Sequence, residues 1–238
     1  MNIETAETIL LKYWGYSEIK PSQADVINNL IDGRDCLAIL PTGSGKSITY
    51  QIPSLMKEGF CVVVTPLLAL MEDQVRDLKS RNIKAIALSG SQNIDEMIRI
   101  FDLFRHGEYK FLYLAPERLN QNLVIDFLRK AKVNLWAIDE AHCIAQWGFN
   151  FRPSYQKLAI LRDLHPAIPI LALTATATEQ ITTEIIQALR LKSPELISRP
   201  MIRHNIEIHI EKREDKTDRI QAIAKAQNSN GIIYVPSR

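Results

Sequence analysis

The sequence has little cysteine, with only three in 238 residues. Cys36, Cys61 and Cys143 lie far apart, each within an apolar run, and no CxxC pair occurs. This spacing argues against a zinc site and more strongly against a disulfide framework, since both need cysteines in closely spaced or matched sets. We therefore expect no zinc in this chain and three cysteines buried as small hydrophobic side chains.

Other features are also missing. No apolar run approaches the ~20 residues that span a bilayer, and the start of the chain, residues 1–4, lacks the basic and apolar segments of a signal peptide. We expect an intracellular protein with no membrane partner. The formal net charge of +2 is too small to indicate a partner, so binding to nucleic acid has to be argued from particular residues.

What is present is the composition of a globular protein, with 46% hydrophobic and 24% charged residues. Short runs rich in Val, Ile and Leu alternate with segments of helical periodicity, which predicts an α/β fold with a mostly parallel sheet flanked by helices. The predicted strands are 36–40, 61–65, 85–88, 111–114, 135–139 and 170–174, and the clearest predicted helices are 67–81, 93–104 and 121–130. Ligands of such sheets bind at the carboxyl ends of the strands.

The pattern changes near residue 193, where Ser193-Pro194 and Arg199-Pro200 interrupt it. We interpret residues 1–192 as the first domain and 193–205 as a linker. Two strand-like runs, 206–210 and 231–235, follow. Residues 206–238 are too few for an independent α/β domain, so we expect them to be the truncated beginning of a second domain.

The strongest local signal is the loop 41–47, between a predicted strand and a helix. Its glycines let backbone N–H groups wrap a phosphate, Lys46 would reach the β- and γ-phosphates, and the Ser47 hydroxyl would ligate Mg²⁺. The loop backbone expected to hold the nucleotide is Thr42, Gly43, Ser44 and Gly45. Leu40 stands where the strict phosphate-loop pattern has its first glycine, so a plain turn remains the alternative.

Two acids, Asp139 and Glu140, follow another predicted strand. One carboxylate can hold the hydration shell of Mg²⁺, with Asp139 as the candidate, and its neighbour can orient the attacking water. The alternative is that the two acids are an ordinary N-cap and first-turn pair. The presence of the phosphate loop in the same chain favours the metal-binding interpretation. Thr174 and Thr176 end a third strand, where their hydroxyls could bond the acidic site or merely cap a turn.

The segment 146–155, directly after the acids, contains four aromatic residues, an Arg, a Gly and a Pro. Exposed rings stack on unpaired bases, at ~1–3 kcal/mol each, so this segment predicts a contact with single-stranded nucleic acid beside the hydrolytic site. The alternative is a loop anchored in the core by its aromatic side chains.

These motifs together resemble the N-terminal part of the RecQ family of DNA helicases, which are superfamily 2 motors. The resemblance rests on residues 16–23, 33–36, 41–53, 65–75, 115–119, 139–148 and 151–153, and on 231–234 with 237–238. It implies a RecA-like phosphate-loop domain and the start of a second RecA-like lobe. It also implies ATP and Mg²⁺ as cofactors, single-stranded and partly duplex DNA as partners, and roles in DNA repair and recombination. The location would be cytoplasmic in a bacterium and nuclear in a eukaryote.

The resemblance also assigns roles to residues. Tyr16 would stack on adenine, and Lys20 and Gln23 belong to the adenine motif, with Gln23 bonding the edge of the base. Lys46, Asp139 and Glu140 would be catalytic. The residues expected to contact DNA or to couple it to hydrolysis are Thr65, Pro66, Arg118, His142, Gln146, Trp147, Phe149, Phe151, Arg152, Thr174 and Thr176.

The chain departs from the family at Lys20, where Arg is usual, and at Phe149, where His is common. Adenine selectivity and one coupling hydrogen bond depend on these positions. The family's later motor motifs are absent from the 238 residues. We therefore expect ATP-driven 3′–5′ movement and unwinding from the intact protein, but little hydrolysis from this chain alone. An RNA-directed helicase and a non-motor nucleotide-dependent switch are the alternatives.

Overall fold

The computed structural model describes residues 3–90, 92–107, 109–145, 153–199, 206–212, 216–226 and 230–234. The chain divides into two compact units, Met1–Met201 and Ile202–Arg238. The first contains the whole sheet and all the predicted site residues that the structure describes.

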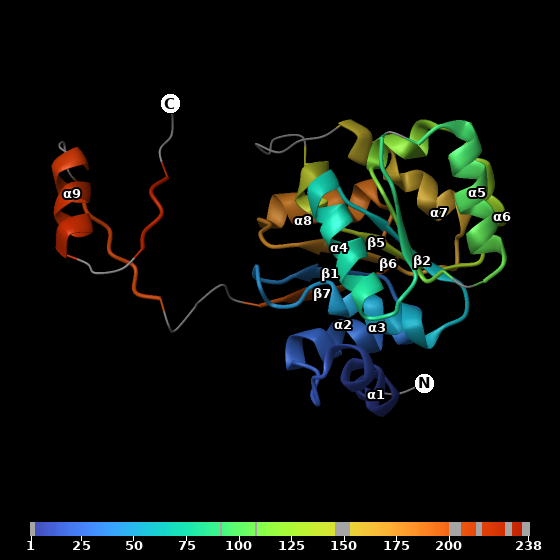
Figure 1. The fold of residues 1–238 in the computed structure, drawn as a ribbon, viewed down its shortest axis with the longest axis horizontal. Helices are drawn as coiled ribbons and strands as arrows, with labels where there is room; N and C mark the ends of the chain where they lie inside the picture. Colours follow the sequence, from blue (N-terminus) through green and yellow to red (C-terminus); the bar gives the residue numbers. More distant parts are fainter. Residues whose placement is uncertain are drawn as a thin grey trace. The chain divides into compact units, whose positions relative to one another are not determined.

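The core of the first unit is a seven-stranded sheet with the order β3-β4-β2-β5-β6-β1-β7 (Figure 1). Every strand pairing within the described residues is parallel, as the sequence predicted. The strands are β1 (Cys36–Ile39), β2 (Phe60–Val64), β3 (Ala85–Leu88), β4 (Phe111–Leu114), β5 (Val133–Ile138), β6 (Ile170–Thr174) and β7 (Glu195–Ser198).

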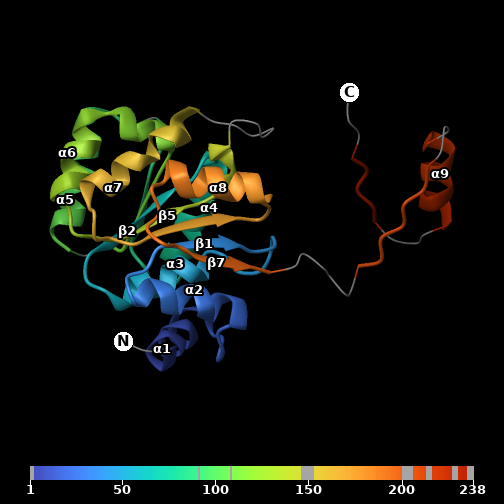
Figure 2. The ribbon, with the colours of Figure 1, turned by 180° about the vertical axis from the view of Figure 1, so that it is seen from behind.

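Helices cover both faces of this sheet (Figures 1 and 2). Side chains alternate between the faces along each strand, so Val62 and Trp136 enter one core cluster while Cys61 and Leu135 enter the other. This is why the strands read as continuous apolar runs. The first cluster includes residues of α5 (Ile94–Arg105), α6 (Asn122–Lys130), α7 (Ile160–Leu164) and α8 (Glu179–Ala188). The second includes residues of α2 (Pro21–Ile31), α3 (Ile48–Met56) and α4 (Leu68–Ser80).

Two smaller features complete the first unit. Helix α1 (Ile3–Trp14) packs on α2 and α3 through a third apolar cluster. Three short 3₁₀ helices follow strands β4 and β5, and they are η1 (Pro116–Asn120), η2 (Ala141–Ile144) and η3 (Pro153–Ala159). All three cysteines are free and buried, as expected.

The helix boundaries differ from the sequence expectation by a residue or so, for reasons of capping. Helix α5 begins at Ile94 rather than Asn93, because Asn93 is its N-cap. The Asn93 side chain accepts a hydrogen bond from the Glu96 N–H at 2.9 Å, and the Glu96 carboxylate accepts one from the Asn93 N–H at 2.9 Å. This reciprocal pair fixes the start of the helix.

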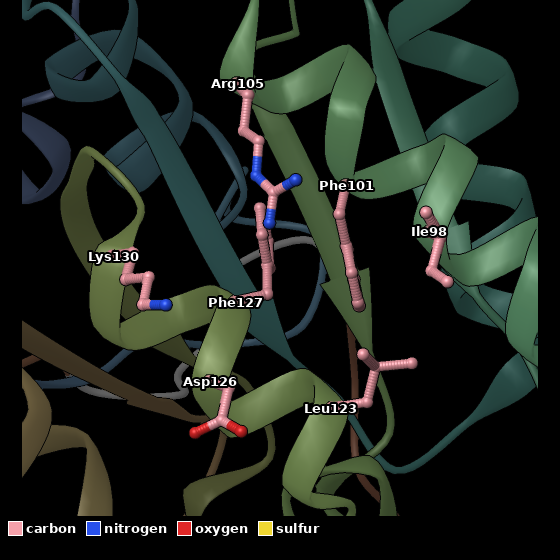
Figure 3. A pocket seen from close by; sticks show the side chains of 7 residues that line it. All are labelled: Ile98, Phe101, Arg105, Leu123, Asp126, Phe127 and Lys130. Carbon is pink, nitrogen blue, oxygen red and sulfur yellow. The ribbon is translucent and has the colours of Figure 1, made fainter.

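The packing of α5 on α6 is aromatic. Phe101 and Phe127 stack with ring centroids 4.1 Å apart and an interplanar angle of 5°. Figure 3 shows both rings beside a pocket of about 100 Å³, which Arg105 and Leu123 also line. None of the predicted site residues lines this pocket, so we interpret it as a packing groove.

Strand β7 lies in the segment interpreted as a linker and was not predicted from the sequence. It pairs in parallel with β1, with Ile197 beside Ala38. Only Ile197 of this four-residue strand is buried, so its sequence lacks the apolar run that marked the other strands. An edge strand needs to bury only one face, and this weakens its signal.

Within the described residues, no strand is found in the segments where two were expected, 206–210 and 231–235; residue 235 lies outside the described residues. The described residues 206–212 and 230–234 have no strand assignment, and α9 (Lys216–Ala226) has no buried residue. A strand forms only when its backbone groups find a partner, and apolar periodicity alone does not supply one. In the described part of the chain no helix is both long and apolar enough to cross a membrane.

Candidate nucleotide site

The predicted catalytic residues follow three neighbouring strands. The phosphate loop follows β1 and Asp139 follows β5, while β6, which ends at Thr174, lies between these two strands. The Leu40 N–H donates to the Thr174 carbonyl at 3.0 Å, and the Asp139 N–H donates to the Val64 carbonyl at 2.9 Å. All three therefore emerge at the carboxyl edge of the sheet, where ligands of α/β folds bind.

The phosphate loop has the backbone shape that its glycines allow. Gly43 and Gly45 have φ of 79° and 80°, a region that other residues rarely adopt. The Ser44 N–H donates to the Pro41 carbonyl at 3.2 Å, which closes the turn. Although Leu40 replaces the first glycine of the strict pattern, the later glycines form the curved loop.

Gln23 of α2 hydrogen-bonds to the backbone of this loop. Its Nε2 donates to the carbonyls of Ser44 and Gly45 at 2.9 and 3.2 Å, and its Oε1 accepts from the Lys20 N–H at 3.2 Å. Both amide hydrogens are then used, and Oε1 keeps one lone pair. The buried Gln23 thus ties the predicted adenine motif to the phosphate loop and retains a single acceptor for a base.

A pocket of about 280 Å³ opens beside Gln23. All three predicted adenine-motif residues, Tyr16, Lys20 and Gln23, line it together with Gly43 and Gly45. Tyr16 is 64% exposed, which leaves its ring available for stacking. An aromatic ring, an amide acceptor and a phosphate loop around one pocket suit a purine nucleotide.

Lys46 lies on the same side as the two acids. Its Nζ is 3.5 Å from the Leu40 carbonyl. Burial raises the pKa of Asp139 and the His142 contact lowers that of Glu140, and the Lys46 charge acts on both carboxyl groups in the lowering direction. The side chain is therefore close enough to both carboxylates to interact with them electrostatically. A cation held by phosphate-loop backbone and near paired acids is what binding of a polyphosphate requires.

The pKa of the Asp139 carboxyl group is raised by its surroundings. Burial, and then the neighbouring Glu140 carboxylate, raise the pKa of Asp139 from 3.8 to about 6, against the opposing effects of Lys46 and His142. The Glu140 N–H donates to Asp139 Oδ1 at 3.0 Å. Two adjacent carboxylates with too little positive charge around them would bind a cation favourably.

Glu140 has a strained backbone and a charged partner. Its φ and ψ are 49° and 44°, a left-handed conformation that is uncommon outside glycine and is concentrated at functional sites. The His142 ring Nδ1 lies 3.1 Å from Glu140 Oε2. This contact is the main cause that lowers the pKa of Glu140 below its ordinary value.

His142 links the acids to the threonine turn. Contact with the Cys143 sulfur and with the Glu140 carboxylate raises the pKa of His142 to about 10. Its Nδ1 also lies 3.0 Å from Thr174 Oγ1, and that hydroxyl donates to the Thr176 carbonyl at 3.0 Å. The structure therefore brings Glu140, His142, Thr174 and Thr176 into one hydrogen-bonded chain.

The residues expected to ligate Mg²⁺ suit a divalent cation. Asp139 supplies a buried carboxylate whose charge is poorly compensated, and Ser47 is the N-cap residue of α3 at the end of the phosphate loop. Between them in sequence, the buried Tyr50 hydroxyl of α3 lies 3.2 Å from the Tyr113 hydroxyl. Within the described residues, the buried Ser44 hydroxyl of the same loop has no hydrogen-bond partner. Oxygen donors of this kind are the ligands that Mg²⁺ prefers.

Two of the residues predicted to contact DNA are buried in the structure. Thr65 follows β2 and is buried. Arg118 is also buried, and its guanidinium donates to Ser89, Gln92 and Gln121 and contacts the Met97 sulfur. These bonds tie η1 to the segment before α5, so the Arg118 side chain organises this surface rather than extending from it.

The aromatic segment lies partly outside the described residues. Gln146, Trp147, Phe149, Phe151 and Arg152 are among the residues that the structure does not describe. Its last aromatic residue, Tyr155, is fully buried, as the alternative of a segment anchored in the core by an aromatic side chain requires at this position. The Tyr155 hydroxyl donates to the Asp139 carbonyl at 3.0 Å. No periodicity in the sequence distinguishes this ring from the other three, so the contact could not be anticipated.

Comparison with known proteins agrees with this geometry. The pattern of the DEAD/DEAH box helicase family matches residues 20–184, which contain the phosphate loop, both acids and the threonine turn. The chain therefore belongs to the DEAD/DEAH box helicase family.

The similarity to particular helicases extends over nearly the whole chain. The probable ATP-dependent DNA helicase RecS of Bacillus subtilis is 41% identical over 233 residues, which are 96% of this chain and 47% of RecS. The ATP-dependent DNA helicase RecQ of Haemophilus influenzae is 37% identical over 98% of this chain and 38% of that protein. The predicted resemblance to RecQ helicases is confirmed, and the chain spans half or less of the length of these relatives.

A solved structure confirms the fold class. The hypothetical ATP-dependent RNA helicase from Sulfolobus tokodaii superposes with a TM-score of 0.62 at 20% identity, over 84% of this chain and 57% of that one. At this identity the likeness establishes the RecA-like helicase fold.

Proposed function

We propose that this chain is the ATP-binding lobe of a DNA helicase that couples ATP hydrolysis to 3′–5′ movement on single-stranded DNA and to duplex unwinding. The observation that carries the proposal is the convergence of Lys46 with Asp139 and Glu140 at one edge of the sheet. The RecQ and RecS relatives, both named as ATP-dependent DNA helicases, support DNA as the substrate. Because the chain spans less than half of either relative, the activity is proposed for the whole protein.

Different residues of the site would bind the base, the phosphates and the metal ion. Tyr16 would stack on adenine, and the remaining Gln23 Oε1 lone pair would accept from an amino group on the base. The phosphate-loop N–H groups and Lys46 would hold the polyphosphate. Ser47 and Asp139 would hold Mg²⁺, which neutralises phosphate charge when bound.

Glu140 is the best placed group to orient and deprotonate the attacking water. Its carboxyl group is ionised at neutral pH, as in an ordinary glutamate, and the His142 contact lowers its pKa further. A general base has to be unprotonated before it can accept a proton. The protonated His142 would hold the carboxylate in place through Nδ1–H. Thr174 then connects this pair to the end of β6.

The first experiment measures ATP binding and hydrolysis in the whole protein. Glu140→Gln should abolish DNA-stimulated turnover while ATP still binds, whereas Lys46→Ala should weaken ATP binding as well. Asp163→Asn, which changes an exposed acid on α7, is the matched control and should leave both unchanged. Full turnover in Glu140→Gln would contradict the assigned role.

The second experiment tests the substrate and direction. Duplexes with a 3′ or a 5′ single-stranded tail should differ, and only the 3′-tailed one should be unwound. Stimulation of the ATPase by RNA rather than DNA would favour an RNA-directed helicase. A protein whose hydrolysis responds to neither would be a nucleotide-dependent switch.

A further inference from the structure

A pocket of about 400 Å³ lies at the edge of the sheet opposite to the nucleotide site. Two of the residues that line it, Lys84 and Lys110, directly precede β3 and β4. The strands are parallel, and the phosphate loop and the paired acids follow β1 and β5. The pocket therefore opens at the amino edge of the sheet. Its volume is within the range of small-ligand sites in proteins.

Three lysines from separate parts of the chain line this pocket. Lys12 comes from α1, Lys84 from the turn after α4, and Lys110 from the segment before β4. None of the described lining residues is acidic. The whole chain has 29 Lys and Arg against 27 Asp and Glu, so its composition does not account for a lining of one sign. Like charges gathered in one pocket repel each other, and a bound anion would relieve that repulsion.

The main chain holds the ammonium group of Lys110 in position. Its Nζ donates to the carbonyls of Lys57 and Gly59, at 2.9 and 3.2 Å. An ammonium group has three N–H donors, so in the described contacts one is left for a ligand. Burial lowers the pKa of Lys110, against the opposing charge of Glu58, which itself pairs with Lys132. A partly buried cation that is short of negative charge binds an anion favourably.

The turn that contains Lys84 has a defined geometry. Asn82 follows α4 with a left-handed φ of 59°, a conformation that Asn adopts more readily than most residues. The Ile83 N–H then donates to the Leu78 carbonyl at 2.9 Å. The Lys110 N–H donates to the Lys84 carbonyl at 2.9 Å. These bonds place Lys84 and Lys110 beside each other at the start of neighbouring strands.

Most of the remaining lining is apolar or aromatic. It consists of Ile9 and Tyr13 of α1, Leu55 of α3 and the buried Ile83. The Tyr13 ring packs edge-on against Trp14, with ring centroids 6.0 Å apart. Ligand pockets commonly combine an apolar wall, which covers the body of the ligand, with a few polar groups that fix its orientation. An apolar wall beside three lysines suits an organic group that carries a phosphate.

We propose that this pocket binds a small phosphate ester, such as a nucleoside or sugar phosphate, with its phosphate on Lys12, Lys84 and Lys110. The organic part would lie against Tyr13 and Leu55. The inference goes beyond the proposed function and does not depend on it, because this pocket and the nucleotide pocket share no lining residue. The described residues predicted to contact DNA end or follow strands, which places them toward the other edge of the sheet and favours a small ligand here.

The test is calorimetric titration of the whole protein with thymidine 5′-monophosphate. Lys12 and Lys84 are exposed, so Lys12→Gln and Lys84→Gln should fold normally. Each should weaken binding roughly threefold to tenfold, the range for one lost charge-assisted hydrogen bond. Lys130→Gln, which removes an exposed lysine of α6, is the matched control and should bind as the unsubstituted protein does. Binding should also persist in Lys46→Ala, which removes the phosphate-loop lysine.

Three results would overturn the inference. Binding that is lost in Lys46→Ala but unchanged in Lys12→Gln and Lys84→Gln would place the ligand at the phosphate loop. The absence of binding at millimolar thymidine 5′-monophosphate would leave the pocket without a phosphate ligand. A short oligothymidylate is the second titrant, and an equal loss of its affinity in the two pocket variants would assign the lysines to a DNA surface. None of these titrations measures hydrolysis, so failure of the proposed function would be seen separately.

Discussion

Replacement of Asp35 by Asn should destabilise the fold strongly. Asp35 precedes β1 and is 4% exposed. The groups that hydrogen-bond to its carboxylate in the described structure are all donors. These are the N–H groups of Ile170 and Lys192, at 2.9 and 2.6 Å, and the guanidinium of Arg162. An Asn keeps the shape but brings an amide NH₂ that has no acceptor among these partners.

The size of the effect follows from burial. Breaking a buried ion pair by neutralising one partner costs about 3–5 kcal/mol, because the other charge is left unpaired in the interior. Arg162 is 7% exposed, so water cannot replace the lost carboxylate. For a unit of about 200 residues this loss lowers the Tm by roughly 6–20 °C.

The assay is urea unfolding of the protein, followed by circular dichroism, with the midpoint and the slope both recorded. Asp163→Asn is the matched control. Asp163 lies next to Arg162 and pairs with Arg190, but both side chains are about 60% exposed, so its loss should cost less than about 1 kcal/mol.

A loss below about 1 kcal/mol for Asp35→Asn, or one equal to that of the control, would refute the reasoning. A double replacement, Asp35→Asn with Arg162→Met, also removes the positive charge and checks the cause. It should recover part of the stability lost in Asp35→Asn, since no charge is then left unpaired in the interior while the amide oxygen can still accept from a backbone N–H.

Three further predictions address the site. Gly45→Ala should weaken ATP binding about tenfold or more, because a Cβ there would lie 2.5 Å from Gln23 Nε2. Gly43 has a similar φ but open space around it, so Gly43→Ala should weaken binding less. Calorimetric titration of both variants with ATP checks this. Asp139→Asn should stabilise the metal-free protein by about 2–3 kcal/mol at neutral pH, at 1.36 kcal/mol per pKa unit. A raised carboxyl pKa favours the protonated form in the folded state, so the ionising Asp139 side chain lowers stability as the pH rises from 3.8 to about 6. Urea unfolding should therefore show no gain in stability for Asp139→Asn at about pH 4. The absence of a gain at neutral pH would contradict the raised pKa. Arg118→Ala should lower the Tm together with DNA affinity, and weaker DNA binding at an unchanged Tm would instead indicate a direct phosphate contact.

The sequence predicted the sheet well because most of its strands are buried on both faces. A strand such as β2, with all five residues buried, has to be apolar throughout, and six of the seven strands were expected within two residues of their bounds. Strand β7 was not, because three of its four residues are exposed. Its pairing with β1 depends on a register that no local pattern encodes.

The site was predictable in its components but not in its connections. The loop 41–47 and the acids 139–140 could be found because phosphate binding and metal binding need these residue types after strands. The Gln23 bonds to Ser44 and Gly45 could not, since they join residues 21 and 22 positions apart through a single side-chain nitrogen. The burial of Arg118 could not be predicted either, because the sequence of a motif does not show whether the donors of a charged residue face solvent or the protein.

The unfavourable features of the site point to a common cause. Asp139 is buried beside a second carboxylate, Glu140 has a left-handed backbone, and the phosphate-loop hydroxyl of Ser44 is buried without a partner among the described residues. Each costs stability. A bound cation would offset the charge of the paired carboxylates, and a polyphosphate would give the Ser44 hydroxyl an acceptor. The surrounding bonds from Gln23, His142 and Tyr155 hold this arrangement in place. The stability that the sheet supplies thus maintains a site that is complete only when its ligand is bound, and ligand binding should therefore raise the Tm more in the unsubstituted protein than in Asp139→Asn.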